Sequence, residues 1–137
     1  MPTPVIFDRF KQDVAHKVHN LSSDSLKVAL TNTLPDVSTA AVLTDITQIA
    51  AGAGYTAGGY AIATTSSGQT AGTYSLVLGA VNIAASGGTM ETWRWAVLYN
   101  DTAASDPVIA LWDRGSPISL ASGSSTQIDA GTWLTND

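Results

Sequence analysis

The stretch Thr92-Trp-Arg-Trp-Ala-Val-Leu-Tyr99 decides the fold. It is rich in aromatic and β-branched residues, which favour strands, and its side chains alternate between two faces at period two. One face carries the large side chains Trp93, Trp95, Val97 and Tyr99. The other face carries Thr92, Arg94, Ala96 and Leu98. We therefore predict a strand over 92–99, and we expect at least two of the four tryptophans to lie in the core.

The segments on either side of this strand repeat the pattern of short strands separated by turns. Upstream, Leu26, Val28 and Leu30 alternate with more polar residues, which predicts a strand over 26–32 that Pro35-Asp36 closes. Clusters of Gly, Ser, Asn, Asp and Pro separate the other apolar runs. Further strands are predicted near 60–65, 73–78, 80–84, 108–112, 117–121, 125–129 and 132–135. This punctuation is typical of an antiparallel β-sandwich or jelly-roll-like domain, so the fold class is mainly β.

The N-terminal part has a different periodicity. Phe7, Phe10, Val14, Val18 and Leu21 recur at helical spacing, with charged residues between them. They predict one amphipathic α-helix over 7–21 that lies on the outside of the β body. We expect one domain over 1–137, with an N-terminal arm over 1–6, the helix over 7–21 and the β body over 26–135.

Between the first strand and the β-rich half lies a glycine-rich segment. Leu43, Ile46 and Ile49 are spaced by three, which suits a short helical turn on a sheet edge. Gly52, Gly54, Gly58 and Gly59 follow within a few residues. They predict a surface loop whose backbone visits positive φ.

The composition excludes several classes of protein. Of 137 residues, 63 are Ala, Thr, Ser or Gly and only 17 are charged, with a net charge of −5. No basic residue lies between Lys27 and Arg94, so we predict no nucleic-acid partner. No apolar run is long enough to cross a membrane, and the start lacks the pattern of a signal peptide, so we expect no membrane partner. The absence of cysteine excludes disulfides and thiolate chemistry.

The chain offers few groups for catalysis. His16 and His19 are three residues apart and could meet near Asp13 or Asp24, but a metal site needs a further ligand at fixed spacing. No Gly-x-Ser-x-Gly elbow supports a hydrolase, and the aspartates in the turns after 100 are explained by turn chemistry as well as by Ca²⁺. We predict no enzyme, no cofactor and no metal. A small hydrolase or metal-dependent enzyme is a third hypothesis, after the two structural roles described below.

Partner contacts are expected at two segments and at the tryptophans. The N-terminal segment could extend across a neighbour, glycine permits close backbone approach to a partner, and exposed aromatics are typical interface anchors. The interface candidates are Pro2, Pro4, Phe7, Phe10, Gly52, Gly54, Tyr55, Gly58, Trp93 and Trp95.

Four segments resemble a family of small structural proteins of tailed bacteriophages. They are Phe7-Asp-Arg-Phe-Lys11, the run from His19 to Thr33, the run from Leu43 to Gly59, and the run from Trp95 to Asp113. The resemblance covers most of the chain and is weakest from Gly123 to Asp137. It implies a β-rich virion subunit, a head decoration or cement protein that binds the major capsid protein on the outer capsid surface. It brings no catalytic or cofactor residues.

This family membership would make the chain a protein of the virion that is made in the host cytoplasm. Small virion subunits are commonly symmetric, so a homo-oligomer, a trimer or dimer, is expected. The alternative is a tail or fibre component that binds the host surface, which the aromatic content and the glycine loop favour.

Overall fold

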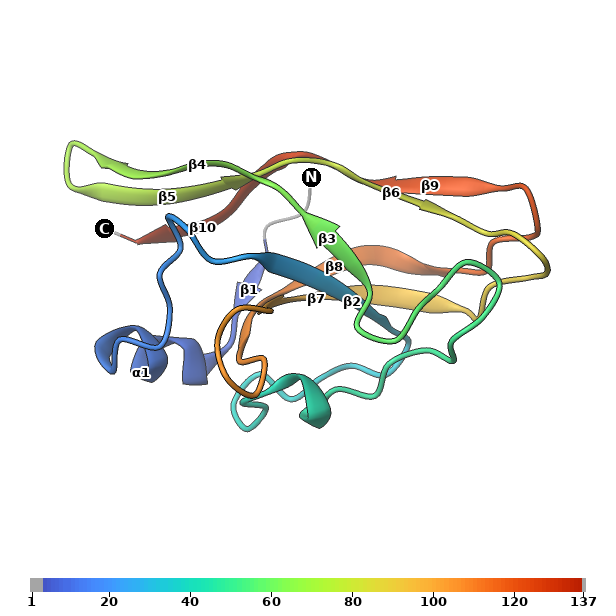
Figure 1. Cartoon of the computed structure of the whole chain (residues 1–137), viewed down its shortest axis with the longest axis horizontal. Helices are drawn as coiled ribbons and strands as arrows, with labels where there is room; N and C mark the ends of the chain where they lie inside the picture. The colour runs from blue at the N-terminus through green and yellow to red at the C-terminus, as the bar shows by residue number, and fades with distance from the viewer. Residues whose placement is uncertain (1–3, 137) are drawn as a thin grey trace.

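A computed structural model describes residues 4–136 and shows two layers of antiparallel β-sheet (Figure 1). The lower layer is a five-stranded sheet in the order β1-β8-β7-β2-β3. Its strands are β1 (Val5–Ile6), β8 (Val108–Ile118), β7 (Trp93–Asn100), β2 (Leu26–Thr31) and β3 (Tyr60–Ile62). The prediction of a mainly β, antiparallel, sandwich-like fold with one N-terminal helix is confirmed.

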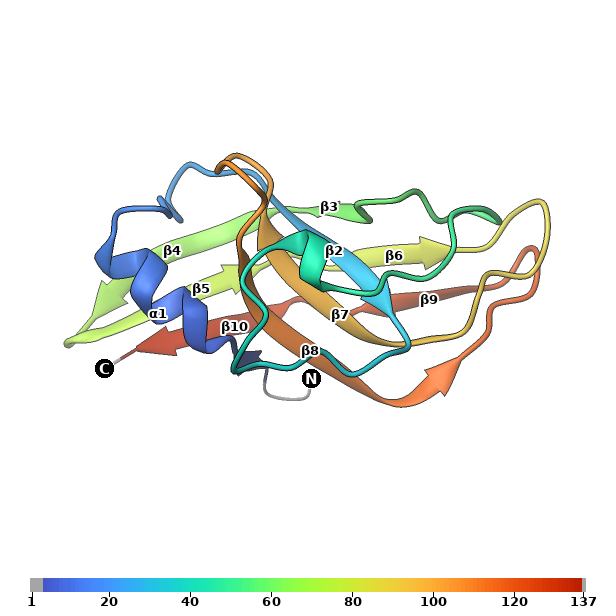
Figure 2. The ribbon, with the colours of Figure 1, turned by 90° about the horizontal axis from the view of Figure 1, so that it is seen from below.

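The upper layer is made of two smaller sheets that lie end to end (Figures 1 and 2). A three-stranded sheet has the order β10-β5-β4, and a two-stranded sheet pairs β6 with β9. The strands are β4 (Thr64–Thr70), β5 (Thr73–Leu78), β6 (Val81–Ala84), β9 (Ser125–Ile128) and β10 (Gly131–Asn136). The chain passes from the lower to the upper layer between β3 and β4 (Figure 1).

The β4–β5 hairpin closes with a two-residue turn. Ala71 and Gly72 both have positive φ, at 53° and 87°, as a type I′ turn requires. The turn projects beyond the end of β10 in Figure 1. β4 is the outer strand of its sheet, and its sequence TTSSGQT contains neither a charge nor a proline.

The main core lies between the two layers. It includes Leu26, Val28 and Leu30 of β2, Leu76 and Leu78 of β5, and Trp133 of β10. The predicted alternation of β2 is thereby confirmed. Three of the four tryptophans, Trp93, Trp112 and Trp133, are buried, as expected.

A second apolar cluster covers the outer face of the five-stranded sheet. It joins Phe7, Ala29, Val97, Tyr99 and Val108 with residues of the 37–46 segment. This segment contains the short 3₁₀ helix η1 (Leu43–Asp45), as the spacing of Leu43 and Ile46 predicted. Because both faces of the sheet are covered, β7 is buried over most of its length on both sides.

The two tryptophans of β7 do not share a face, which corrects the prediction from alternation. Trp93 belongs to the core between the layers together with Ala96 and Leu98, whereas Trp95 packs against the outer cluster with Val97. The pairing of β7 with β8 shifts between Trp93 and Trp95. Such an irregularity breaks the period of two, and it cannot be read from the sequence of β7 alone.

The helix is shorter than predicted. α1 spans Asp8–Ala15 rather than 7–21. Lys17 has φ 63°, its N–H donates to the Val14 carbonyl, and the Val18 N–H donates to the Asp13 carbonyl. These bonds form a Schellman motif. Glycine is the usual residue at the position of Lys17, so the sequence carries no signal for the end of the helix there. The apolar face is also corrected, since Val14 is exposed and Asp13 is buried.

Several strand boundaries differ from the prediction. The runs 108–112 and 117–121 are not two strands, because β8 continues from Val108 to Ile118. The run 60–65 is divided between β3 and β4. β4 was missed beyond 65 because its Ser, Thr and Gly residues are almost all exposed and show no apolar alternation.

The N-terminal arm is partly a strand of this chain. β1 pairs with β8, Val5 opposite Leu111 and Ile6 opposite Ala110. The Phe7 N–H then donates to the Ile109 carbonyl at 3.1 Å. The expected arm across a neighbour is therefore docked on its own sheet from Val5 onward; Pro2 lies outside the described residues.

Candidate functional site

The predicted interface residues fall into two groups. The side chains of Phe7, Phe10, Tyr55 and Trp93 are buried. They fill this chain's own core and have almost no surface to offer a partner, which corrects their assignment as interface anchors. Pro4, Trp95 and Gly58 are half-buried, and Gly52 and Gly54 are exposed.

Side-chain hydrogen bonds of Gln48, Tyr55 and Tyr99, which we call the lock, hold the glycine-rich loop against the five-stranded sheet. The Gln48 Oε1 atom accepts hydrogen bonds from the Tyr55 hydroxyl at 2.6 Å and from the Gly58 N–H at 2.8 Å. The Tyr55 hydroxyl accepts from the Leu30 N–H at 3.2 Å, and the Tyr99 hydroxyl donates to the Gly58 carbonyl. Burial raises the pKa of Tyr55 to about 12. The loop lies at the surface, as predicted, and these hydrogen bonds hold it in a defined shape against the sheet.

Two glycines of this loop are required by close backbone approach. A Cβ on Gly59 would stand 1.8 Å from the Val28 carbonyl oxygen, and one on Gly54 would stand 2.4 Å from that of Ala84. Both residues also have positive φ, at 81° and 99°. The predicted backbone conformation is confirmed, and here the glycines admit the chain's own backbone.

His19 is the centre of a buried polar cluster. The Asn100 amide N–H₂ donates to the Asp24 carboxylate at 2.6 Å and lies 3.0 Å from His19 Nδ1. Nδ1 therefore accepts, the proton sits on Nε2, and Nε2 faces the Asp13 carboxylate at 3.9 Å. Arg9 Nε donates to the other oxygen of Asp13 at 3.0 Å.

The surroundings of His19 favour the neutral imidazole. Burial lowers the pKa of His19, while the charges of Asp13 and Asp24 oppose this shift. His16, the predicted partner, is exposed. Within residues 4–136, no group of three or more histidine, aspartate and glutamate side chains is placed to hold a metal ion.

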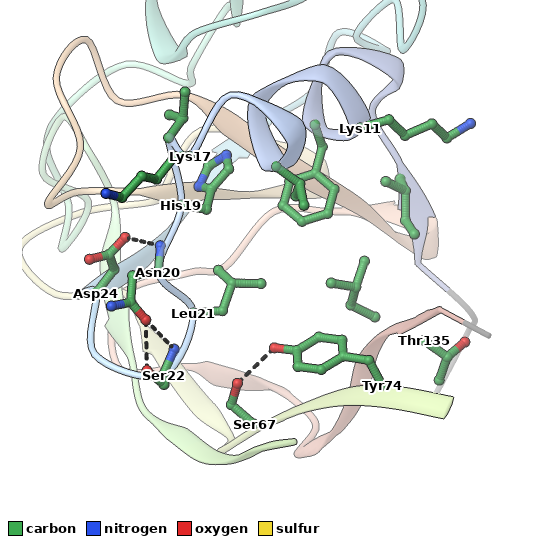
Figure 3. A pocket seen from close by; sticks show the side chains of 15 residues that line it. Lys11, Lys17, His19, Asn20, Leu21, Ser22, Asp24, Ser67, Tyr74 and Thr135 are labelled. Atoms are coloured by element: carbon green, nitrogen blue, oxygen red, sulfur yellow. Dashed lines mark hydrogen bonds between the residues drawn. The ribbon is translucent and has the colours of Figure 1, made fainter. Parts of the chain in front are cut away.

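A pocket of about 890 Å³ opens next to this cluster (Figure 3). It lies between α1 with the following segment 17–24 and the three-stranded sheet. Its apolar lining comes from Ile6, Phe10, Val14, Val18, Leu21 and Leu134. Tyr74 and Ser67 join across β5 and β4 by a 2.7 Å hydrogen bond between their hydroxyls. No local sequence pattern predicts the pocket, because its walls come from three distant parts of the chain: residues 6–24, the β4–β5 hairpin and β10.

Lys11 and Lys17 stand on opposite sides of the pocket, with their ammonium groups directed away from its centre (Figure 3). Lys11 Nζ is 4.0 Å from the Asp8 carboxylate, at the limit of an ion pair. In the part of the chain that the structure describes, Lys17 forms no ion pair. The pocket therefore combines apolar walls with a charged rim, to which Asp24 also belongs.

The half-buried Trp95 lies beside an ion pair. Arg94 donates to both carboxylate oxygens of Asp113, at 2.9 and 3.1 Å, and its guanidinium stands 5.0 Å from the Trp95 ring centre. The hydrogen bond from Arg94 lowers the pKa of Asp113. Asp113, one of the aspartates after residue 100 considered above as Ca²⁺ ligands, lies in β8 and is paired with Arg94.

No family model, curated protein or solved structure matches this chain. None of the helices within 4–136 has the length and apolar character needed to cross a membrane.

Proposed function

We propose that this chain is a structural subunit of a tailed-bacteriophage particle, most specifically a head decoration or cement protein that binds the major capsid protein. The proposed role is not enzymatic. The observation that supports it is that the segments resembling phage structural proteins are also the segments that join the fold together. In such a subunit, motif residues serve shape rather than chemistry.

The run from Leu43 to Gly59 supplies the lock. Gln48, Tyr55 and Gly58 are joined to each other and to β2 by hydrogen bonds, and Gly59 admits the backbone of Val28. A loop fixed in this way keeps its shape without a disulfide.

The runs from His19 to Thr33 and from Trp95 to Asp113 meet in the buried polar cluster. Asn100 is fully buried, and its side-chain oxygen accepts from the N–H groups of Thr102 and Ala103 at 2.9 and 3.1 Å. Its amide N–H₂ reaches Asp24 and His19, so both ends of this side chain are used. Asn100 therefore ties the end of β7 to the segment before β2.

A rigid β subunit of this kind would stabilise a shell by burying surface across the seams between capsid proteins. Binding to the folded subunit would also add to its own stability. The low charge of the chain suits a surface that neighbours cover.

The test is an image reconstruction of particles of the bacteriophage that encodes this chain, with a quantitative count of copies per particle. Density over the head and hundreds of copies are expected. Density restricted to the tail would overturn the decoration role in favour of the tail or fibre alternative.

A second measurement separates a cement role from mere attachment. Particles that lack the subunit are expected to assemble but to lose infectivity sooner on heating, at low salt or with a chelator. Adding back the purified wild-type chain should restore their survival. Equal survival with and without the subunit would contradict a cement role.

A further inference from the structure

The pocket exposes apolar surface next to charged side chains. Its walls are apolar, and Val14 at this site is 51% exposed, which is unusual for an aliphatic side chain. Lys11 and Lys17 lie on opposite sides of its rim (Figure 3). Lys11 is next to Asp8, and Asp24 also lines the pocket, whereas Lys17 has no ion-pair partner within 4–136. An occupant that buries an aliphatic group and brings a carboxylate would satisfy both features.

The turn after β2 presents this combination. Leu34 is 62% exposed, the largest value among the exposed large apolar side chains of residues 4–136. Pro35 and Asp36 follow it directly, and Asp36 is exposed. Of the other two exposed large apolar side chains described, Val14 lies in the pocket and Val5 precedes the pocket residue Ile6.

The turn is held in shape before any partner arrives. The Thr33 N–H donates to the Thr31 hydroxyl at 3.0 Å, and that hydroxyl donates to the Thr47 carbonyl. The Asp36 carboxylate accepts from the Ser38 N–H at 2.9 Å and from its hydroxyl at 2.6 Å. Proline fixes the backbone between these anchors. Little conformational entropy would be lost when this turn docks.

One chain cannot place its own Leu34 in its own pocket. The pocket residues Lys17–Asp24 precede β2, whereas Leu34 follows it. Six residues of extended strand separate the two sites by roughly 20 Å. Figure 2 likewise shows α1 and the far end of β2 well apart.

We propose that the pocket binds the Leu34–Asp36 turn of a second copy of this chain, with Leu34 between the apolar walls and Asp36 at the rim beside Lys17. The contact is heterologous, because a pocket on one copy meets a turn on the next. Repeated contacts of this kind close into a ring when the rotation between copies permits, and otherwise form an open chain. The proposal does not depend on the phage role, since it concerns copies of this chain alone.

Disulfide trapping tests the contact directly, because the chain has no cysteine of its own. A tagged Leu34→Cys variant is mixed with an untagged Val14→Cys variant under mild oxidation, and the mixed dimer is identified by its mass. The matched control replaces Val14→Cys by Val5→Cys, since Val5 is 52% exposed but does not line the pocket. The mixed dimer is expected with Val14→Cys and not with Val5→Cys. Equal yields from the two mixtures would overturn the proposal.

Sedimentation of the purified chain over a range of concentrations gives the second test. Self-association is expected for the wild type, and Leu34→Ser is expected to weaken it about tenfold or more. Lys17→Glu should weaken it comparably. Asp36→Asn should weaken it less, because an asparagine oxygen can still accept from Ser38. Val5→Ser is the control and should leave association unchanged.

These variants change exposed side chains, and circular dichroism with thermal unfolding confirms that each one is folded. A wild-type chain that stays monomeric at millimolar concentration would overturn the proposal. So would a Leu34→Ser chain that associates like the wild type. Neither result bears on where the subunit sits in a particle, so failure here and failure of the phage role are distinguishable.

Discussion

At the scale of single residues, Lys17 occupies a backbone conformation that suits glycine. Its φ of 63° lies in the left-handed region, and the Schellman hydrogen bonds at the end of α1 require that conformation. A Cβ in this region costs about 1 kcal/mol. Replacing Lys17 by glycine removes this strain, but it also makes the unfolded chain more flexible, and that entropy opposes part of the gain.

Lys17→Gly is therefore expected to raise the free energy of unfolding slightly, by up to about 0.5 kcal/mol. Urea unfolding followed by circular dichroism measures it. Lys11→Gly is the control, because the same change inside α1 should lower stability by about 1 kcal/mol. A loss of stability in Lys17→Gly would show that the lysine side chain contributes more than its backbone conformation costs.

Gly59 is the residue whose substitution should cost the most in its loop. A Cβ would meet the backbone of Val28 and Ala29, which cannot move without disturbing β2. Gly59→Ala should lower the free energy of unfolding by about 3 kcal/mol or more. Gly52→Ala shares the positive φ but meets open space, so about 1–2 kcal/mol is expected. If the two variants were equally stable, steric approach would not be the cause.

At the scale of elements, the lock that pins the 51–59 loop should make the protein sensitive to alkali. Burial raises the pKa of Tyr55 from 10 to about 12. Below pH 10 both states keep the proton, and this stabilising contribution is fully present. Between pH 10 and about 12 the unfolded state loses the proton first, so the free energy of unfolding should fall.

Urea titrations across this range measure the slope for the wild type and for Tyr55→Phe. The variant should be less stable at neutral pH because it loses the bonds to Gln48 and Leu30, and its alkaline slope should be shallower. Parallel slopes would mean that Tyr55 ionises alike in both states. Tyr99, whose pKa burial also raises, is expected to supply the slope that remains.

The polar cluster that joins the end of α1 to β7 should give a separate response to acid. Burial lowers the pKa of His19 below 6.5, so the unfolded state binds the proton first as the pH falls. The free energy of unfolding should therefore decline below about pH 6.5, before the aspartates titrate. His19→Gln should flatten this decline, and His16→Gln, at an exposed position, is the control. Stability measured from neutral pH to about pH 5 decides it.

The elements themselves were predictable where packing follows a simple period. The alternation in β2 and the spacing of Leu43 and Ile46 are local signals. The strand and the short helix that they predict are both confirmed. β4 shows no apolar alternation, because almost all of its residues are exposed. The change of face between Trp93 and Trp95 depends on how β8 pairs with β7, which the sequence of β7 does not show. The end of α1 was missed because lysine stands where glycine is usual.

At the scale of the whole molecule, the two apolar clusters share the five-stranded sheet. Trp93 and Val97 stand on the same strand but belong to different clusters. If the elements that cover either face were to detach, apolar side chains of β7 on that face would be exposed to water. Tryptophan fluorescence and far-ultraviolet circular dichroism are therefore expected to report one coincident unfolding transition in urea. Two resolved transitions would show that the outer cluster unfolds on its own.

The sandwich could be predicted from the sequence, whereas the pocket and the docking turn could not. The pocket needs Ile6, Tyr74 and Leu134 to meet residues of the 17–24 segment, and no local pattern brings these together. The buried positions of Phe7, Phe10 and Tyr55 likewise depend on which elements cover them. Sequence patterns identify apolar faces but not what each face meets.

The hairpin turn at Ala71–Gly72 has a consequence for the use of this protein as a carrier. Both residues are exposed, a Cβ on Gly72 would meet nothing within 4 Å, and the turn projects past the body (Figure 1). Exposed loop tips of this kind tolerate inserted segments best. A peptide epitope inserted there would leave the core intact and stay accessible at the tip of the hairpin.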